Sequence, residues 1–147
     1  MRQACAQDPK NFENAFAVGE QLRTLAFTGE DGSDKNAQEA AMWFRRVIAL
    51  NPRHVNGHMH LGMCLDWVGN HEEAAVHFTR ALELDPNHWY PRGMMGWHLI
   101  QIEKYEEARE WLLKSSYVNW TAYPIATPYL GMIDRIIARQ NAETPRH

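Results

Sequence analysis

The segments FRRVIALNPRH at residues 44–54 and FTRALELDPNH at residues 78–88 repeat one another in register. Their Phe, Arg, Leu, Pro and His residues recur at one offset of 34 residues. The same offset relates an alanine and the large apolar residue four positions after it in three places: Ala40 and Phe44, Ala74 and Phe78, Ala108 and Leu112. A fixed period of about 20 to 50 residues indicates a solenoid of stacked structural repeats.

Each period predicts two helices joined by a short turn. Ala74 and Phe78 lie on one face of the second helix, because residues spaced four apart share a helix face. Gly62 in the first helix lets a neighbouring helix approach closely, and Gly69 stands at the expected turn. The second helix ends at residues 85–86, because the residue before Pro avoids the α region. One hairpin cannot bury its own apolar face, whereas stacked copies can.

The segment LGMCLDWVGNHEEAAVHFTRALELDP, residues 61–86, resembles the tetratricopeptide repeat. That signature places Leu-Gly, an aromatic residue, Ala, Phe, Ala and Pro at set intervals over 34 residues. Residues 55–88 match it best, with Leu61, Gly62, Ala74, Phe78, Ala81 and Pro86 at motif positions. His58 stands where Trp is expected and Leu65 where the aromatic residue is expected. Residues 89–122 match through Met95, Gly96, Ala108 and Leu112, and depart at Ser115 and Trp120.

The unit before residue 55 is longer than the others. Gly19 and Leu22 supply its first-helix feature nine residues too early, and the polar segment 28–37 predicts a lengthened loop. Asp8-Pro9 echoes the end of a further unit, so the chain begins either with a short stub or as a piece of a longer array, which we favour. At the far end, Thr127 as N-cap predicts a lone amphipathic helix that closes the solenoid.

We therefore expect an all-α fold: a right-handed α-solenoid of about three tetratricopeptide-like helical hairpins plus a C-terminal capping helix, in one domain over residues 1–147. Its expected parts are a tail of a preceding unit or stub at 1–10, units at 11–54, 55–88 and 89–122, a capping helix at 123–140 and a frayed tail at 141–147. Motif-position residues that we expect in the core include Leu50, Leu84 and Val118.

Composition favours an ordinary globular protein. Of 147 residues, 45% are hydrophobic, and the formal net charge of −3 implies no general attraction to nucleic acid or membrane. No apolar run approaches the ~20 residues of a membrane span, and the first residues lack the apolar segment of a signal peptide. Cys5 and Cys64 give neither a disulfide framework nor metal spacing. We expect reduced thiols in a cytoplasmic protein, with Cys64 acting as a small apolar residue.

The sequence contains no motif for catalysis or for a cofactor. It has no Cys-x-x-Cys, no His-Glu-x-x-His, no nucleophile elbow and no phosphate-binding glycine loop. His54 and His58 are four apart, but the helix before them should end at Asn51, so His54 falls in the turn. His54 and His88 share one repeat position, which suggests a use in turns or capping. We expect no metal, no cofactor and no enzymatic activity.

The tetratricopeptide resemblance implies that the first helices of successive units line a concave groove for a protein or peptide. Carried onto this chain, the implied partner-binding residues are Phe16, Glu20, Arg23, Asn56, Met59, His60, Met63, Asp66, Trp67, Tyr90, Met94, Trp97 and Gln101. The Lys, Asn and Arg set of the carboxylate-binding subgroup is not presented as a whole. An apolar groove rich in Met and aromatic residues suits an amphipathic helix or extended apolar peptide. The alternative is that Trp67 and Trp97 pack internally or on a missing repeat.

The predicted function is thus a non-catalytic scaffold or adaptor that binds a protein or peptide partner, without nucleic acid and without membrane insertion. Two alternatives stay open. The chain could be a regulatory or substrate-recruiting module of a larger multidomain protein or enzyme. It could also be a self-assembling solenoid, which forms homo-oligomers by end-to-end stacking.

Overall fold

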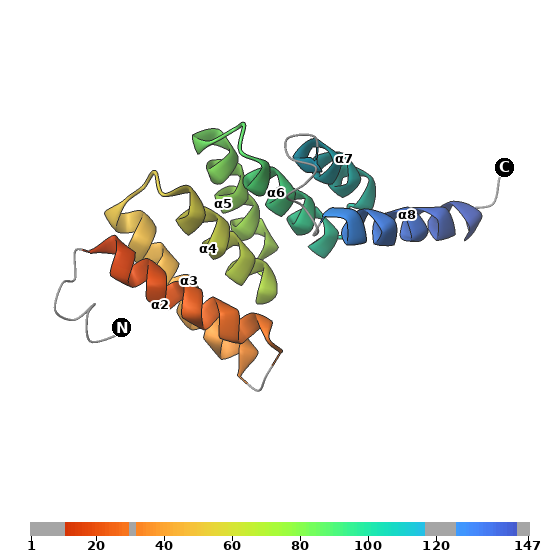
Figure 1. Ribbon diagram of the computed structural model, residues 1–147. Coiled ribbons are helices and arrows are strands. Elements are labelled where there is room, and N and C mark those ends of the chain that lie inside the picture. The colour runs from red at the N-terminus through yellow and green to blue at the C-terminus, as the bar shows by residue number, and fades with distance from the viewer. Residues whose placement is uncertain (1–10, 30–31, 117–125, 144–147) are drawn as a thin grey trace. The chain divides into compact units, whose positions relative to one another are not determined.

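A computed structural model describes residues 11–29, 32–116 and 126–143. The helices in these ranges are α2 (Phe12–Phe27), α3 (Ser33–Leu50), α4 (Val55–Trp67), α5 (His71–Leu84), α6 (Trp89–Gln101), α7 (Tyr105–Ser116) and α8 (Ala126–Glu143) (Figure 1). No strand occurs in these ranges. The all-α prediction is therefore confirmed.

The helices pair as the repeat predicts. α2 packs on α3, α4 on α5 and α6 on α7, and α8 contacts α7. Contacts divide the chain into two compact units, Met1–Pro86 with α2 to α5 and Asn87–His147 with α6 to α8. The division falls close to the boundary predicted after residue 88. In the first unit, α4 also contacts α3 and α2, so its two hairpins are stacked.

A glycine in each first helix receives the large apolar residue of the second helix. A Cβ atom on Gly62 would lie 2.8 Å from Cζ of Phe78, and one on Gly19 would lie 2.8 Å from Cε1 of Phe44. In the second unit, a Cβ on Gly96 would lie 2.7 Å from Cγ of Leu112. These distances are shorter than van der Waals contact, so no larger residue fits without movement. The close approach predicted from the glycines is confirmed.

The nine extra residues of the first hairpin are distributed differently from the prediction. α3 already begins at Ser33, so the predicted loop over residues 28–37 is wrong in its second half. Compared with α4 and α5, α2 continues three residues further beyond its glycine, the connection is two residues longer, and α3 begins four residues earlier before its Phe. Residues 34–36 are polar and form the solvated first turn of α3. Their composition alone does not distinguish such a turn from a loop.

The helix ends follow local rules. α3 and α5 end at Leu50 and Leu84, ahead of the two prolines, and Gly69 has the left-handed φ of +82° between α4 and α5. The His54 ring nitrogen Nδ1 accepts a hydrogen bond of 2.9 Å from the Gly57 N–H, and His88 caps α6 in the same way. The capping role expected for His54 and His88 is confirmed.

The last helix covers the end of the second unit. Ile133 is fully buried with Leu99, Ala108 and Leu112. α8 begins at Ala126 rather than after a Thr127 cap, and it continues to Glu143, beyond the predicted end at residue 140. Its polar last turn stays helical because it continues an established ladder of hydrogen bonds. The predicted stub 1–10, residues 123–125 and the end of the frayed tail lie outside the described residues.

One expected core residue lies on the surface. Leu50 is 39% exposed, because it is the last residue of α3 and the chain turns away directly after it. Leu84, its repeat counterpart, is partly buried. Val118 lies outside the described residues. Motif position therefore predicts burial in the middle of a helix better than at its end.

Candidate partner-binding surface

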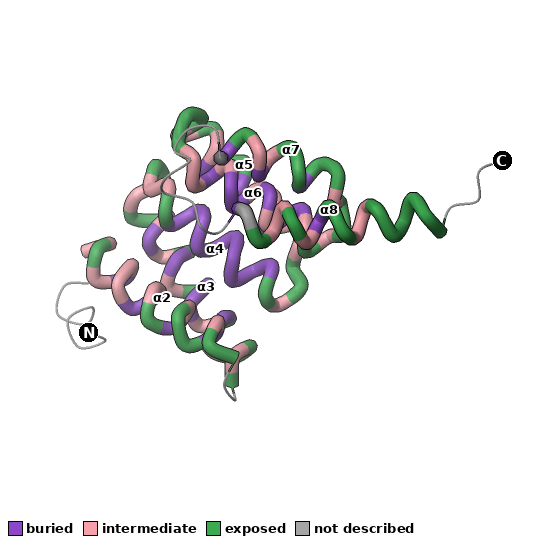
Figure 2. The backbone as a smooth tube through the Cα atoms, turned by 45° about the vertical axis from the view of Figure 1, so that its right-hand side comes forward, coloured by how far each residue is buried: buried purple, intermediate pink, exposed green. Residues whose placement is uncertain are grey.

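Helix α4 is too deeply buried to present most of its predicted binding residues. Residues 57–66 are all buried, and Figure 2 shows this run as a purple stretch of the tube. Met59 has no exposed surface at all. The cause is that α4 contacts α2, α3 and α5. Packing against three helices leaves α4 exposed chiefly at its ends, at Asn56 and Trp67.

Five residues predicted at the binding surface belong to the core instead: Met59, His60, Met63, Asp66 and, in the second unit, Met94. Asp66 shows why a charged residue is tolerated there. Its Oδ1 lies 2.8 Å from Nδ1 of His71, across the turn from α4 to α5. Buried carboxylates need such partners.

The two units hold the remaining predicted residues at varied depth. Asn56 is exposed at the start of α4. Trp67 keeps 37% of its surface exposed, although its ring lies 4.7 Å from the Phe27 ring and its Nε1–H donates to Asp34 over 3.2 Å. Internal packing therefore accounts for much of the burial of the Trp67 side chain. On α6, Tyr90 and Trp97 are half-buried and Gln101 is exposed.

The predicted residues of α2 meet α4 through aromatic and polar contacts. The Phe16 ring stacks on the His60 ring with centroids 5.4 Å apart, and it also packs edge-on against Phe44. Glu20 Oε1 lies 3.7 Å from Nδ1 of His60, which is too long for a hydrogen bond. Glu20 therefore keeps much of its acceptor capacity for solvent or a partner.

Two buried nitrogen atoms lie in this region without a hydrogen-bond partner among the described residues: Nδ1 of His60 and Nε of Arg23. Burial, with the Arg23 charge adding to it, lowers the pKa of His60 to about 3. Hence His60 is neutral at physiological pH, and Glu20 has no cationic imidazole beside it. Burial also raises the pKa of the Cys64 thiol to about 12, so Cys64 is an inert core residue as predicted.

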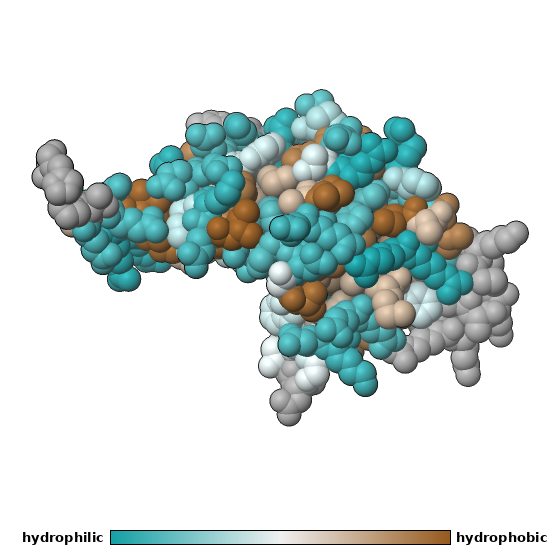
Figure 3. Space-filling view, turned by 180° about the vertical axis from the view of Figure 1, so that it is seen from behind, coloured by the Kyte–Doolittle hydropathy of each residue, from teal (hydrophilic) through white to brown (hydrophobic). Residues whose placement is uncertain are grey.

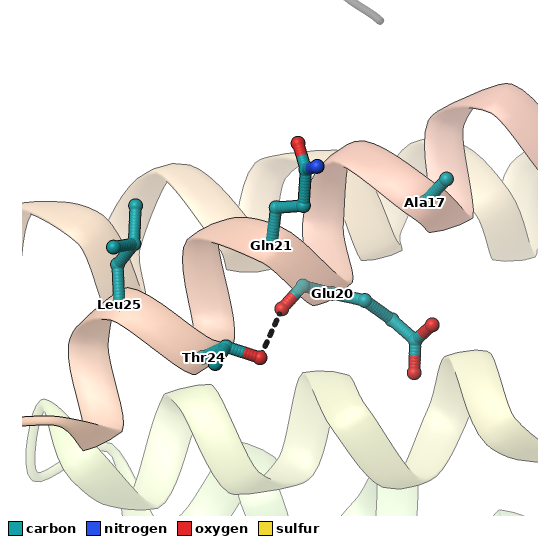
Figure 4. A pocket seen from close by; sticks show the side chains of 5 residues that line it. All are labelled: Ala17, Glu20, Gln21, Thr24 and Leu25. Carbon is teal, nitrogen blue, oxygen red and sulfur yellow. Dashed lines mark hydrogen bonds between the residues drawn. The ribbon is translucent and has the colours of Figure 1, made fainter.

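The exposed side of α2 borders a hollow of about 580 Å³. Its described lining consists of Ala17, Glu20, Gln21, Thr24 and Leu25, and Figure 4 shows them along this one helix. Thr24 donates its hydroxyl hydrogen to the Glu20 carbonyl oxygen over 2.8 Å, so this donor is already used within the helix. Leu25 is 48% exposed. The lining is therefore mainly apolar, with one carboxylate.

Gln21 and Leu25 were not among the residues predicted from the sequence. Gln21 lies four residues after Ala17, and Leu25 lies four residues after Gln21, so these three side chains share a helix face, which is the signal that could have found them. On the face of the molecule in Figure 3, hydrophobic side chains form separate patches among hydrophilic ones. Exposed apolar side chains that line a hollow are candidates for a partner-binding site.

Other site classes find no support in the part of the chain that the structure describes. It contains no group of three or more His, Cys, Asp or Glu side chains that could hold a metal ion. None of its helices combines the length and apolar character needed to cross a membrane.

Comparison with known proteins bears on the fold. Residues 55–88 match the family model for the tetratricopeptide repeat. No curated protein matches the sequence significantly. A thermophilic TPR protein from Thermus thermophilus is similar in structure, with a TM-score of 0.77 at 17% identity over 88% of this chain and 68% of that one.

Two further solved structures that are similar to this chain are complexes. The TPR2B domain of yeast Sti1, in its pHsp70 complex, has a TM-score of 0.70 at 18% identity over 84% of this chain and 96% of that one. The first TPR of Spaghetti (RPAP3), bound to the HSP90 peptide SRMEEVD, has a TM-score of 0.69 at 15% identity over 87% and 96%. At these identities the likeness establishes the fold alone.

Proposed function

The chain carries a tetratricopeptide repeat within a tetratricopeptide-repeat fold, and on this premise we propose that it is a non-catalytic adaptor that binds a peptide segment of a partner protein. The observation that carries the proposal is the hollow along α2. It combines an exposed apolar floor with a carboxylate that no cation neutralises among the described contacts of Glu20. Exposed apolar surface in a hollow is costly unless a partner covers it.

The lining supports one chemistry for the partner. An apolar side chain of the partner packs on Ala17 and Leu25, while a backbone N–H or a basic side chain donates to Glu20. Burying about 100 Å² of apolar surface in this way contributes roughly 2.5 kcal/mol before the costs of association. An amphipathic helix or an extended apolar peptide presents such a pattern.

An acidic peptide is the wrong partner for this hollow. The solved neighbour mentioned above holds SRMEEVD, whose last four residues include three carboxylate side chains. Glu20 would repel such a ligand, and the buried His60 stays neutral and offers no compensating charge. A fluorescence-anisotropy titration of this chain with SRMEEVD should therefore show no saturable binding. Saturation at micromolar peptide would contradict the assigned partner chemistry.

A site-specific crosslink tests the site itself. We would place a photoreactive p-benzoylphenylalanine at Gln21 and identify the crosslinked partner by mass spectrometry. Leu25→Glu should remove the crosslink, because it introduces a charge into the apolar floor. The matched control is Val76→Glu, which changes a residue that is 64% exposed on α5. A crosslink of wild-type yield in the Leu25→Glu variant, with both variants equally helical, would refute the proposal.

A further inference from the structure

Two histidines of the first unit contact one another across the α4/α5 hairpin. Nδ1 of His58 on α4 lies 3.1 Å from Nδ1 of His77 on α5, with ring centroids 5.4 Å apart. The other ring nitrogen of His58, Nε2, lies 3.1 Å from the carbonyl oxygen of Pro52, in the turn before α4. The pair therefore ties together two helices and the turn that precedes them.

The pair replaces aromatic residues of the repeat. His77 occupies the position of Trp43 in the preceding unit and of Trp111 in the following one, each 34 residues away. His58 stands where the tetratricopeptide pattern has Trp. Titratable residues have thus replaced apolar ones at two positions of one unit, and the two replacements touch. Positions that break a repeat's pattern in a correlated way are candidates for a function beyond packing.

The acceptor in the turn determines where the protons lie. A carbonyl oxygen only accepts, so the His58 Nε2 carries the hydrogen, and the neutral His58 Nδ1 is an acceptor. His77 must then donate through its Nδ1–H. This is the less common tautomer of neutral histidine, and its Nε2 is left as an acceptor 3.8 Å from Glu73 Oε1. Both nitrogens of His58 and one of His77 are thereby satisfied.

Charged groups surround the pair on each packed element. From α3, Arg45 binds the Glu73 carboxylate at 2.7 Å, and on α5 Arg80 pairs with Glu83 at 2.8 Å. Burial lowers the pKa of His58, and Arg80 lowers it further, against the effect of the Pro52 carbonyl. Burial and the neighbouring His58 lower the pKa of His77, while Glu73 raises it. The pKa of His54, in the turn before α4, is lowered by burial and by His58.

The pair is also accessible to solvent protons. Both histidines line a hollow of about 450 Å³, whose other described walls are side chains of α5: Ala75, Val76, Thr79, Arg80 and Glu83. Water in this hollow reaches the contact without any unfolding of the hairpin. Proton uptake by the pair is therefore governed by the free energy of protonating the two rings and not by access of solvent to them.

We propose that the His58–His77 contact is an acid-sensitive latch that holds α4 to α5 and to the Pro52 turn. The first proton enters at His77 Nε2, faces Glu73 and leaves the contact intact. A second proton on His58 Nδ1 would set one N–H against another across 3.1 Å, so the contact opens. The latch is closed at and above neutral pH and opens as the pH falls through the two coupled titrations of the pair.

Nitrogen-15 NMR of the intact chain tests the closed state. At pH 7.5, long-range ¹H–¹⁵N spectra should show His58 protonated on Nε2 and His77 protonated on Nδ1. Lowering the pH should then give two coupled titration steps, both below the ordinary histidine pKa of about 6.5. If both rings carry the ordinary Nε2–H tautomer, or if they titrate independently near that value, the contact does not exist and the proposal is overturned.

Amide hydrogen exchange tests the opening. Protection factors of Gly57, His58 and Met59, corrected for intrinsic rates, should fall at least about tenfold between pH 7.5 and pH 5. In His77→Trp, which restores the residue of the neighbouring units, they should fall at least about fivefold less than in wild type, because only the loss of stability that both proteins share through His60 remains. His88→Asn, which keeps an N-cap and removes another histidine, should behave as wild type. An equal loss of protection in wild type and His77→Trp would refute the latch. If His77→Trp does not fold, the tautomers measured by nitrogen-15 NMR of the wild type still test the proposal.

Discussion

Single residues decide how closely the helices of a hairpin approach. Phe78 is fully buried, and its ring fills the space that a side chain on Gly62 would need. The same relation joins Gly19 to Phe44 and Gly96 to Leu112. Glycine normally weakens a helix, so its presence in all three first helices has a packing reason rather than a local one.

Gly62→Ala should therefore destabilise the protein, although alanine favours the helix. The new Cβ would lie 2.8 Å from an aromatic ring that is itself packed on all sides. We expect a loss of about 1–3 kcal/mol in the free energy of unfolding, measured by urea denaturation. Gly131→Ala on α8, where a Cβ meets nothing within 4 Å, is the control and should be neutral or slightly stabilising. Equal effects of both substitutions would contradict the packing argument.

His60 makes stability depend on pH at the residue level. Burial between Phe16 and Phe44 lowers its pKa in the folded protein to about 3, whereas an unfolded histidine titrates near 6.5. Since the unfolded state binds more protons between these values, the contribution is complete above pH 6.5 and is lost as the pH falls toward 3.

Removing this histidine should flatten the pH profile. Between pH 7.5 and pH 5, one such group costs about 2 kcal/mol of unfolding free energy. His60→Phe, which keeps an aromatic ring in the core, should lose less stability over that interval than wild type by about this amount. Urea unfolding at a series of pH values measures it. Parallel profiles for the two proteins would show that His60 is not buried neutral.

At the scale of elements, caps and terminal packing decide where each helix ends and what covers it. His54 and His88 cap α4 and α6 through their ring nitrogens. α8 covers the second unit through Ile133, whereas the neighbouring Asp134 forms an exposed ion pair with Arg109 at 2.7 Å. Apolar burial and exposed charge thus meet at adjacent positions of one helix.

Ile133→Ala should detach α8 from α7. Removing a fully buried isoleucine side chain costs about 2–5 kcal/mol, and Ile133 is the residue that α8 contributes to the buried cluster with Leu99, Ala108 and Leu112. Hydrogen exchange measured by mass spectrometry should show loss of protection over residues 126–143. Asp134→Asn is the adjacent control and should cost less than about 1 kcal/mol, because exposed ion pairs contribute little. Protection of α8 that survives Ile133→Ala would mean that other residues hold it.

At the scale of the whole molecule, the chain consists of two compact units, each with its own buried Gly–aromatic or Gly–leucine core. Repeat proteins unfold in parts when the coupling between neighbours is weaker than the stability within them. Phe78→Ala in the first unit and Leu112→Ala in the second each remove a fully buried side chain.

We expect each of these substitutions to affect its own unit most. The loss should be about 3–5 kcal/mol for Phe78→Ala and about 2–5 kcal/mol for Leu112→Ala. Hydrogen exchange along a urea series should show α4 and α5 opening earlier in the first variant, and α6 and α7 in the second. A single transition that both substitutions shift equally over all helices would instead make the chain one cooperative unit.

Sequence alone determined the helical hairpins of this protein and most of their ends. The repeat period marks the hairpins, and prolines, glycines and capping histidines determine the backbone within a few residues of themselves. Gly19, Gly69 and His54 therefore play the roles that their positions predicted. The wrong half of the loop at 28–37 shows the limit of such rules, because a polar helical turn and a polar loop have the same composition.

Only the tertiary structure decided which helix faces are free. The periodicity of α4 marks one apolar face, but three neighbouring helices also bury Met59, His60, Met63 and Asp66. The exposed lining of the hollow comes instead from α2 and includes Gln21 and Leu25. It likewise brought His58 and His77 together from two helices. The physical reason is that burial and long-range contacts depend on how many elements surround a helix, which a single repeat unit does not specify.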